Sequence, residues 1–380
     1  MRFPEFTKEW EMASLQDIAA VNPKSNPLQN SFVYIDLEAV EKGELRKIQE
    51  VMREEAPSRA QRVIYKNDIL FQCVRPYQKN NYIHKIQSKS NQQWVASTGY
   101  AQIRTTEIPN YIYHLLNTDG FNRKVMVRCT GSSYPAINSE DLATIRFYLT
   151  TDTKEQLKIS RLLDLLDERI ATQNKIIEKL QSLIKGLNNT LQYDTGGKSV
   201  CLGDILLERS ERSQTNNQHE VLSSTVKGIF SQREYFSKDI ASENNVGYKI
   251  IRLHDVVLSP QNLWMGNINY NDRFEIGIVS PSYKVFSIAD GYDNQFVAAM
   301  LKTHRALYSY MMVSEQGASI VRRNLNMEAF SQLVFKIPSL DKQREIGYAI
   351  SLLKSQLKTA NKIIKAYTSQ KQYLLRQMFI

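Results

Sequence analysis

Cysteine is scarce in this chain. Its 380 residues contain three cysteines, Cys73, Cys129 and Cys201, which lie far apart and never in the Cys-x-x-Cys spacing of a metal site. An odd number of widely spaced cysteines indicates neither a disulfide framework nor a zinc site. We therefore expect three free thiols, buried in the fold.

Long apolar runs are also lacking. No segment approaches the roughly 20 apolar residues of a membrane span, and the N-terminal MRFPEFTKEW has no apolar core of a signal peptide. The hydrophobic fraction of 42% and the charged fraction of 23% are typical of a globular protein. These features predict a soluble, cytoplasmic protein without a membrane partner, and the length predicts two domains.

Motifs of the common enzyme classes are absent. The five histidines show no metal-ligand spacing, and no Gly-x-Ser-x-Gly motif occurs. The segment TGGKS at 195–199 lacks the first glycine of a phosphate-binding loop, because Gln192 occupies that position. Asn22-Pro23-Lys24 lacks the second proline of a DNA methyltransferase motif. We expect no catalysis, no metal and no cofactor in this chain, and we interpret 195–199 as a linker.

Positive charge is in excess. The chain has 49 Lys and Arg against 39 Asp and Glu, a formal net charge of +10. Cationic side chains near phosphates gain affinity by releasing condensed counterions. The charge therefore favours a polyanionic partner, although many basic proteins bind no nucleic acid.

The chain is one unit repeated twice in tandem. Leu15, Asp17 and Ile18 return 187 positions later in the segment CLGDILL, and residues 63–70 align with residues 250–257 at the same offset. The four residues from Asn174 to Ile177 recur from Asn361 to Ile364, again 187 positions on, whereas Tyr100 matches Tyr283 at an offset of 183. An offset that changes within the unit and returns to 187 at its end indicates a shared scaffold whose surface loops differ in length.

Each copy ends in a helical stretch with a heptad seam, in which apolar residues alternate four and three positions apart. An isolated helix with this stripe would leave it in water, so we expect the two helices to pair, running antiparallel. The predicted seam residues are Ile159, Leu163, Leu166, Ile170, Ile177, Leu180, Ile184 and Leu187 in the first helix, and Ile346, Ile350, Leu353, Leu357, Ile364 and Leu374 in the second.

These patterns predict an α+β fold with two tandem globular domains, separated by two long helices that form an antiparallel coiled coil. The expected boundaries are residues 1–153 for the first domain, 154–192 for the central helix, 193–340 for the second domain and 341–380 for the C-terminal helix. About 38 helical residues at ~1.5 Å each give a rod of ~57 Å. One DNA turn is ~34 Å, so such a rod suits two readers over separated half-sites.

The loop at 75–93 is the candidate DNA reader of the first copy. It has four Lys or Arg, seven Asn or Gln and no acidic residue. Arginine and lysine can pair with guanine edges or phosphates, and amides can contact adenine. With the loop of TGSSYPAIN, the predicted DNA-binding residues are Arg75, Tyr77, Lys79, Asn80, Asn81, Lys85, Lys89, Gln92, Gln93, Ser133 and Tyr134.

The corresponding loop of the second copy, at 259–275, is less basic. It has five Asn or Gln, a tryptophan and a single arginine, and further positive charge lies at other positions of this copy. The predicted DNA-binding residues are Arg233, Lys238, Gln261, Asn262, Trp264, Asn267, Asn269, Arg273, Arg322 and Arg323. Because the scaffold is shared and the loops differ, we expect each copy to read a different sequence.

The chain resembles the specificity subunits of type I restriction-modification systems over its full length. The motifs that carry the resemblance are Trp10 with Leu15, Asp17 and Ile18, LGDI at 202–205, the strands beginning at Asp68 and Asp255, and KIPSLDKQREI with Pro338, Gln343 and Ile346. The first copy has KEQLKI at 154–159 without the proline, which leaves the start of its helix open by a turn.

The resemblance implies a non-catalytic subunit that recognises double-stranded DNA. Each recognition domain would read one half of a bipartite asymmetric site, and the helices would set the spacing and dock two modification (methyltransferase) subunits. The partners would use S-adenosylmethionine for methylation, and restriction subunits would add ATP- and Mg-dependent translocation and cleavage. Two alternatives stay open: a coiled-coil adaptor whose domains bind proteins or glycans, and a self-contained nuclease or methyltransferase.

Overall fold

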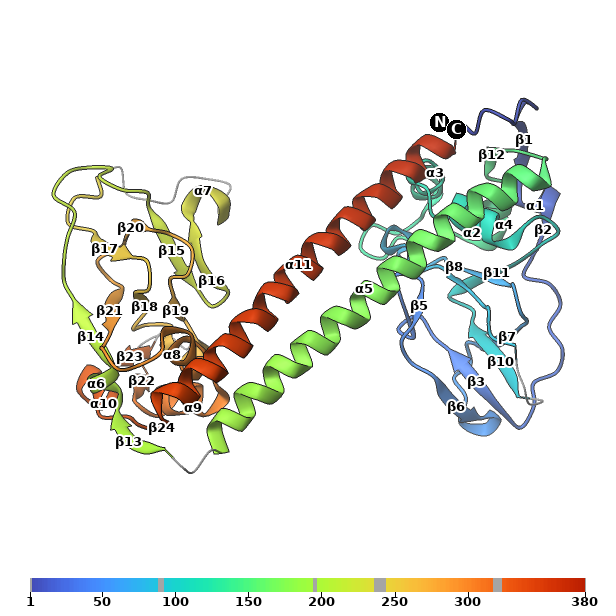
Figure 1. Ribbon diagram of the computed structural model, residues 1–380. Helices are drawn as coiled ribbons and strands as arrows, with labels where there is room; N and C mark the ends of the chain where they lie inside the picture. The colour runs from blue at the N-terminus through green and yellow to red at the C-terminus, as the bar shows by residue number, and fades with distance from the viewer. Residues whose placement is uncertain (1, 88–91, 194–196, 236–243, 317–322, 380) are drawn as a thin grey trace. The chain divides into compact units, whose positions relative to one another are not determined.

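A computed structural model describes residues 2–87, 92–193, 197–235, 244–316 and 323–379 (Figure 1). The chain divides into two compact units, which we call unit 1 (residues 1–174 and 362–380) and unit 2 (residues 175–361). Their boundaries fall after Asn174 and after Asn361, at equivalent positions of the sequence repeat. The long helices therefore contribute residues to both units.

Unit 1 is built around two four-stranded sheets, with strand orders β2-β11-β8-β9 and β6-β3-β10-β7, and two small pairs, β1-β12 and β4-β5. Its strands are β1 (Glu11–Ser14), β2 (Ala19–Val21), β3 (Ser31–Ile35), β4 (Val40–Glu41), β5 (Glu44–Leu45), β6 (Gln49–Met52), β7 (Ala60–Ile64), β8 (Ile69–Gln72), β9 (Tyr82–Ile83), β10 (Gln93–Ser97), β11 (Tyr100–Thr105) and β12 (Arg146–Leu149). Its short helices are α1 (Leu15–Ile18), η1 (Arg53–Glu55), η2 (Pro76–Gln78), α2 (Pro109–Leu116), α3 (Asp119–Arg128) and α4 (Ser139–Ala143).

Unit 2 has a four-stranded sheet of order β14-β21-β18-β19 and the pairs β13-β24, β15-β16, β17-β20 and β22-β23. Its strands are β13 (Lys198–Cys201), β14 (Leu206–Arg209), β15 (Leu222–Thr225), β16 (Gly228–Ser231), β17 (Lys249–Arg252), β18 (Val256–Leu258), β19 (Ile268–Tyr270), β20 (Ile276–Val279), β21 (Lys284–Ile288), β22 (Ser314–Gln316), β23 (Arg323–Leu325) and β24 (Val334–Ile337). Its short helices are α6 (Leu202–Ile205), α7 (Gln232–Tyr235), η3 (Leu263–Met265), α8 (Asn294–Met300), α9 (His304–Met312) and α10 (Met327–Ser331).

The sequence repeat corresponds to a repeat of structure. The turn of helix at LQDI matches the one at LGDI, and the first residues of β8 and β18 occupy equivalent positions of the repeat. The long helices α5 (Thr153–Tyr193) and α11 (Leu340–Met378) also begin at equivalent positions. The missing proline in the first copy therefore does not shift the start of its helix.

The two long helices run antiparallel within each unit, as the heptad seam predicts (Figure 1). In unit 1, Lys371 of α11 pairs with Asp167 of α5 at 2.5 Å, and the Arg169 guanidinium lies 5.7 Å from the Tyr367 ring centre. All fourteen predicted seam residues are buried or half-buried. The predicted α+β class and the coiled-coil arrangement are confirmed, and no described helix is long and apolar enough to cross a membrane.

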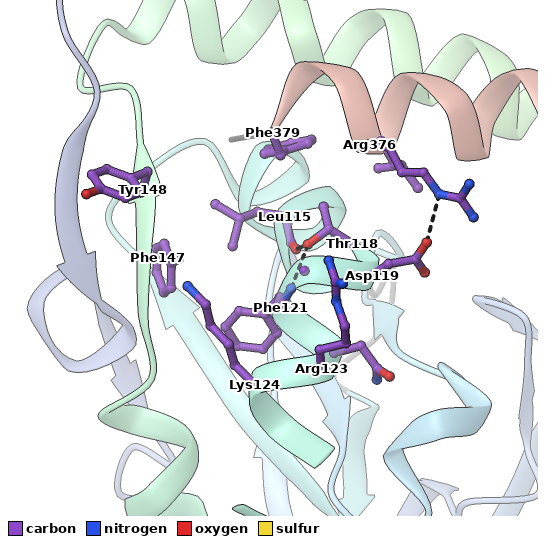
Figure 2. A pocket seen from close by; sticks show the side chains of 13 residues that line it. Leu115, Thr118, Asp119, Phe121, Arg123, Lys124, Phe147, Tyr148, Arg376 and Phe379 are labelled. Atoms are coloured by element: carbon purple, nitrogen blue, oxygen red, sulfur yellow. Dashed lines mark hydrogen bonds and ion pairs between the residues drawn. The ribbon is translucent and has the colours of Figure 1, made fainter. Parts of the chain in front are cut away.

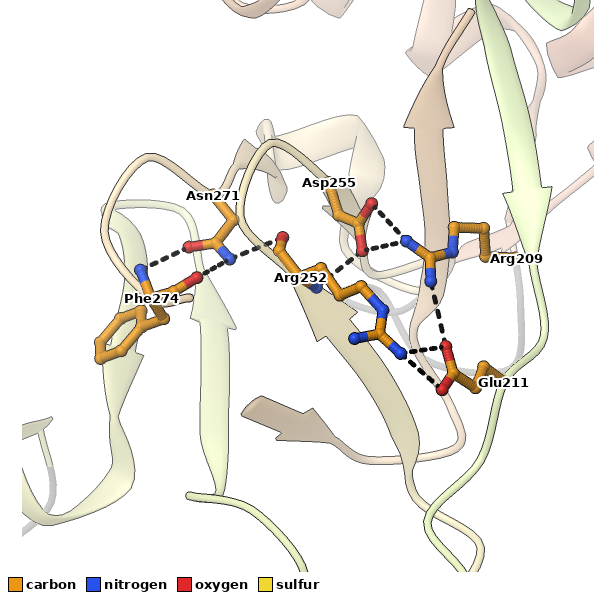
Figure 3. Close-up of polar contacts among 6 residues, drawn as sticks. All are labelled: Arg209, Glu211, Arg252, Asp255, Asn271 and Phe274. Atoms are coloured by element: carbon orange, nitrogen blue, oxygen red, sulfur yellow. Dashed lines mark hydrogen bonds and ion pairs between the residues drawn. The ribbon is translucent and has the colours of Figure 1, made fainter. Parts of the chain in front are cut away.

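The repeated aspartate is buried in both units and is neutralised differently in each. Asp68 accepts hydrogen bonds from the guanidinium of Arg104, on β11, at 2.8 Å. Asp255 accepts from Arg209, on β14, at 3.1 Å, and from the backbone N–H of Arg252 at 2.7 Å (Figure 3). Burial raises the pKa of Asp255, whereas these donors oppose the shift. A buried carboxylate needs such a partner. The partner arginine comes from β11 in unit 1 and from β14 in unit 2.

A glutamine in the first turn of each long helix makes the same pair of bonds. Gln156 donates to the carbonyl of Thr150 at 2.7 Å and accepts from the N–H of Ile108 at 3.2 Å. Gln343 donates to the carbonyl of Pro338 at 2.9 Å and accepts from the N–H of Asp293 at 3.0 Å. Both amides are buried, and each ties the start of its helix to the N-cap of α2 or α8.

Gly347 allows α11 to pack closely on α8. A Cβ at this position would lie 2.2 Å from Asp293 Oδ1 and 2.8 Å from the Phe296 nitrogen. We expect Gly347→Ala to lower the free energy of unfolding by about 1–3 kcal/mol, because the backbone must move apart. Gly186→Ala is the matched control: no described atom outside its own stretch of helix lies within 4 Å of a Cβ placed there, so removal of a helical glycine should stabilise by about 0.5–1 kcal/mol. Urea denaturation measures both, and equal effects would contradict the packing.

The three cysteines are free thiols, as the sequence predicts. Cys73 is buried, and burial raises its pKa to about 12. Cys129 and Cys201 are half-buried rather than buried, a correction to the expectation, because they lie at the ends of α3 and β13 near the surface.

Candidate nucleic-acid interface

Two predicted DNA-binding loops of unit 1 meet through an arginine and a tyrosine. The Arg75 guanidinium lies 4.4 Å from the centre of the Tyr134 ring, and the Arg75 N–H donates to the carbonyl of Pro135 at 2.8 Å. Arg75 has a left-handed backbone, with φ of 54°, which turns the chain into η2. Tyr134 is 64% exposed and Tyr77, in η2, is 51% exposed. This pair is therefore at the surface, where a ligand can reach it.

The equivalent segments of unit 2 meet in the same way, with the two residue types exchanged. Here the Arg323 guanidinium lies 4.8 Å from the Trp264 ring centre, and the Arg323 N–H donates to the carbonyl of Gln261 at 3.2 Å. The aromatic residue comes from η3, after β18, and the arginine from the start of β23, before α10. In unit 1 the loop after β8 supplies the arginine. We call each arrangement, Arg75 with Tyr134 and Trp264 with Arg323, an arginine–aromatic pair.

An arginine held over an aromatic ring is suited to nucleic-acid recognition. The ring fixes the plane of the guanidinium through a cation–π contact, and the N–H groups at its edge stay available to an acceptor. Such donors fit the N7 and O6 acceptors of guanine or two phosphate oxygens. Neither Arg75 nor Arg323 makes an ion pair among the salt bridges of the described residues.

Several predicted DNA-binding amides are instead part of the loop structure. Asn81 accepts from the N–H of Gln72 at 2.8 Å and is 2% exposed. Asn267 and Asn269 are each 5% exposed, and both bond to Ser224. Buried amides with satisfied bonds cannot reach a base edge in this conformation, so we remove these three residues from the candidate interface.

The amides at two further predicted positions make internal bonds but remain half-buried. Asn80 accepts from the N–H of Lys42 at 3.0 Å. Gln93 donates to the carbonyl of Pro27 at 3.1 Å and accepts from the N–H of Gln29 at 3.0 Å. Their first role in the structure is to hold the loops in place.

Some of the predicted cations are paired with carboxylates. Lys79 lies 2.7 Å from Asp119, whose pKa is lowered by Lys79 and Arg376. Arg273 lies 2.6 Å from Glu234, and Lys85 lies 4.0 Å from Asp164. These charges are partly compensated, which weakens their attraction for a phosphate.

For the remaining predicted residues, side-chain contacts neither support nor oppose a role in DNA binding. Ser133, Arg233 and Gln261 are exposed, and Gln92 and Asn262 are half-buried. Lys89, Lys238 and Arg322 lie outside the described residues. Nothing in the sequence signals that Arg75 meets Tyr134, because the contact joins two loops that are far apart along the chain.

A buried histidine lies within the loop at 75–93 of unit 1. The His84 ring packs 4.9 Å from the Trp94 ring, and both residues line a cavity of about 400 Å³ with Tyr65, Gln87 and Gln92. Burial lowers the pKa of His84 to about 4, against a small opposing effect of Asp68. The ring is therefore neutral at pH 7.

This shift predicts an acid-dependent loss of stability. Between pH 6.5 and 4 the unfolded chain binds a proton at His84 that the folded chain does not, so stability should fall by about 3 kcal/mol as pH drops through this range. Below pH 4 this contribution should level off. His84→Gln should reduce the pH dependence of stability by this contribution, as unfolding at pH 7.0 and 4.5 would measure. An equal slope in both proteins would contradict the assignment.

A second, larger cavity of about 1170 Å³ lies between α3 and the end of α11 in unit 1 (Figure 2). Phe121, Phe147 and Phe379 supply apolar walls, and Arg123 and Lys124 supply positive charge. It contains none of the predicted DNA-binding residues. No group of three His, Cys, Asp or Glu in the described part of the chain is arranged for a metal ion.

Comparison with solved structures defines the class of the fold. A type I restriction-modification system S subunit from M. genitalium covers 98% of this chain and 96% of its own, with a TM-score of 0.62 at 14% identity. A chain from a study of complex assembly and conformational transition of the type I R-M system covers 97% of both chains, with a TM-score of 0.53 at 18% identity. These similarities show a shared fold. No match was found among the curated proteins.

A second similarity comes from the sequence of the first copy. Residues 7–182 match the type I restriction modification DNA specificity domain. The match covers the first copy, and the tandem repeat relates the second copy to the matched one. The first copy is thus similar to the DNA specificity domain of type I restriction-modification systems.

Proposed function

We propose that each unit reads one half of a bipartite, asymmetric DNA site, and that the paired helices set the distance between the halves. The observation that carries the proposal is the arginine–aromatic pair, which occurs at equivalent places in both units with its residue types exchanged. The same place on one scaffold is thus chemically different in each copy. Two readers of different half-sites need this property, whereas two readers of one sequence do not.

We propose further that two modification subunits dock on the long helices of this cytoplasmic, non-catalytic subunit. Outside the seam, Leu165 and Leu352 are 39% and 46% exposed, and Ile176 and Ile363 are 43% and 38% exposed. The members of each pair occupy equivalent positions of the repeat, so the same apolar positions are exposed on both helices. Equivalent exposed apolar positions on the two helices support the docking of two copies of one partner. Those partners would bring S-adenosylmethionine, and restriction subunits would use ATP and Mg.

DNA binding and its dependence on salt distinguish the DNA-recognition proposal from the adaptor alternative. The full chain, with its partner subunits, should bind double-stranded DNA with an affinity that falls steeply and linearly on a log–log plot against salt. Each phosphate contact contributes about 0.9 to the slope. Fluorescence anisotropy between 50 and 300 mM salt measures it. An affinity for DNA that is absent or indifferent to salt would contradict the proposal and favour the adaptor.

A further inference from the structure

Unit 2 contains a cationic cavity whose lining includes none of the predicted DNA-binding residues. It has a volume of about 210 Å³ and lies beside the first residues of α9, with α5 and α11 forming its other walls. Lys185, Lys302 and His304 contribute nitrogen atoms, whereas Gln181 and Asn188 contribute amides. No acidic residue is among the described residues that line it.

Lys302 is the inner cation of this cavity. Its ammonium donates to the carbonyl of Gly266 at 2.7 Å, which uses one of its three donors and fixes its position. No carboxylate pairs with it or with Lys185 in the part of the chain that the structure describes. Burial and the positive charge of Lys354 lower the pKa of Lys302 to about 8. The cavity thus concentrates positive charge that the protein itself leaves uncompensated.

Two acidic residues of α5 bond to basic side chains in unit 1. There Asp164 bonds to His114 at 2.9 Å, and Asp167 pairs with Lys371 at 2.5 Å. In the register of the repeat, Asp164 corresponds to Ser351 and Asp167 corresponds to Lys354. Unit 2 therefore has no acid at either position and has gained a lysine at one of them.

A buried polar atom without a hydrogen-bond partner is a further indication that this cavity is a ligand site. The side-chain oxygen of Asn188 is buried and has no hydrogen-bond partner in the part of the chain that the structure describes. A buried polar atom without a partner costs about 1–3 kcal/mol. Rotation of this amide would present its N–H₂ group to an anion in the cavity, because oxygen and nitrogen of an amide exchange places at little cost.

We propose that this cavity binds a phosphate group through Lys302, Lys185 and Asn188. The group can come from free phosphate or from a DNA backbone, since both present the same oxygens. Two ammonium groups and an amide supply charge-assisted hydrogen bonds to these oxygens. The proposal does not depend on the half-site assignment.

The test is a calorimetric titration of the full chain with inorganic phosphate, at constant ionic strength against chloride. We expect saturable binding that Lys302→Met and Lys185→Met each weaken by about tenfold or more. Lys185 lies on the exposed rim, so its variant tests the site even if Lys302→Met folds poorly. Lys179→Met, at an exposed lysine on the preceding turns of α5, should bind as the wild type does. Lys354→Asp, which restores the acid of unit 1, should abolish binding.

A second arm identifies the source of the phosphate. If the group belongs to DNA, Lys302→Met should lower the salt dependence of DNA binding by about one counterion. If it is free phosphate, DNA binding and its salt dependence should be unchanged. The proposal is overturned if the wild type shows no saturable phosphate binding and neither lysine variant changes the DNA slope, or if both variants keep wild-type phosphate affinity.

Discussion

Insertion of seven residues after Asn174 and seven after Asn361 is expected to lengthen the spacer between the two DNA half-sites and to leave both half-sites unchanged. The two positions are equivalent in the repeat and mark the unit boundaries. Seven residues preserve the heptad seam, so the helices stay paired. They add ~10 Å of helix, which corresponds to at most about three base pairs at ~3.4 Å each. Sequencing of methylated sites in a host that carries the complex measures the spacer.

Two controls separate helix length from chain length. Seven glycine and serine residues inserted at 195, in the linker predicted from sequence, should leave the spacer as it is. Seven residues inserted in α5 alone should reduce methylation at all sites, because one helix is then offset from the other. A spacer that stays the same after the double insertion would contradict the helices' role as a ruler.

Loss of one arginine–aromatic pair is expected to affect one half-site only. Arg75→Ala should weaken binding to one half by about 1–3 kcal/mol, or about 5- to 150-fold, through loss of a base or phosphate contact. Arg323→Ala should do the same at the other half. Because the two arginines lie in separate units, the effects of a double variant should add. The readout is binding to a library of sites in which each half is varied in turn.

The ring beneath the arginine supplies a matched control. Tyr134→Phe keeps the ring and should retain near-wild-type discrimination, whereas Tyr134→Leu should resemble a milder Arg75→Ala. Arg75→Lys keeps the charge but loses the planar fork, so a base contact would be lost and a phosphate contact largely kept. Equal changes at both halves after Arg75→Ala would contradict independent readers.

The scaffold was predictable from the sequence because the residues that are buried recur in both copies of the repeat. Apolar residues at a constant offset predict equivalent elements, and β8 with β18 and α5 with α11 begin at that offset. The seam followed from its four-and-three spacing alone. Burial of Asp68 and Asp255, just before β8 and β18, was not predictable, since the arginine that neutralises each comes from a different strand.

The interface was less predictable because its residues act through contacts between distant loops. Composition alone selected Asn81, Asn267 and Asn269 for DNA, yet these amides hold the loops internally. The same reasoning selected the members of both arginine–aromatic pairs one by one, and the structure joins them into pairs. A polar loop residue can serve the loop or its ligand, and only the fold distinguishes the two.

The central claim is that one chain holds two different DNA readers at a fixed separation. The measurement that tests it most directly is methylome sequencing of a host that expresses this chain with its modification and restriction partners. We predict one methylated motif made of two unlike specified halves separated by an unspecified spacer of constant length. A continuous motif, or a motif with two identical halves, would contradict the account.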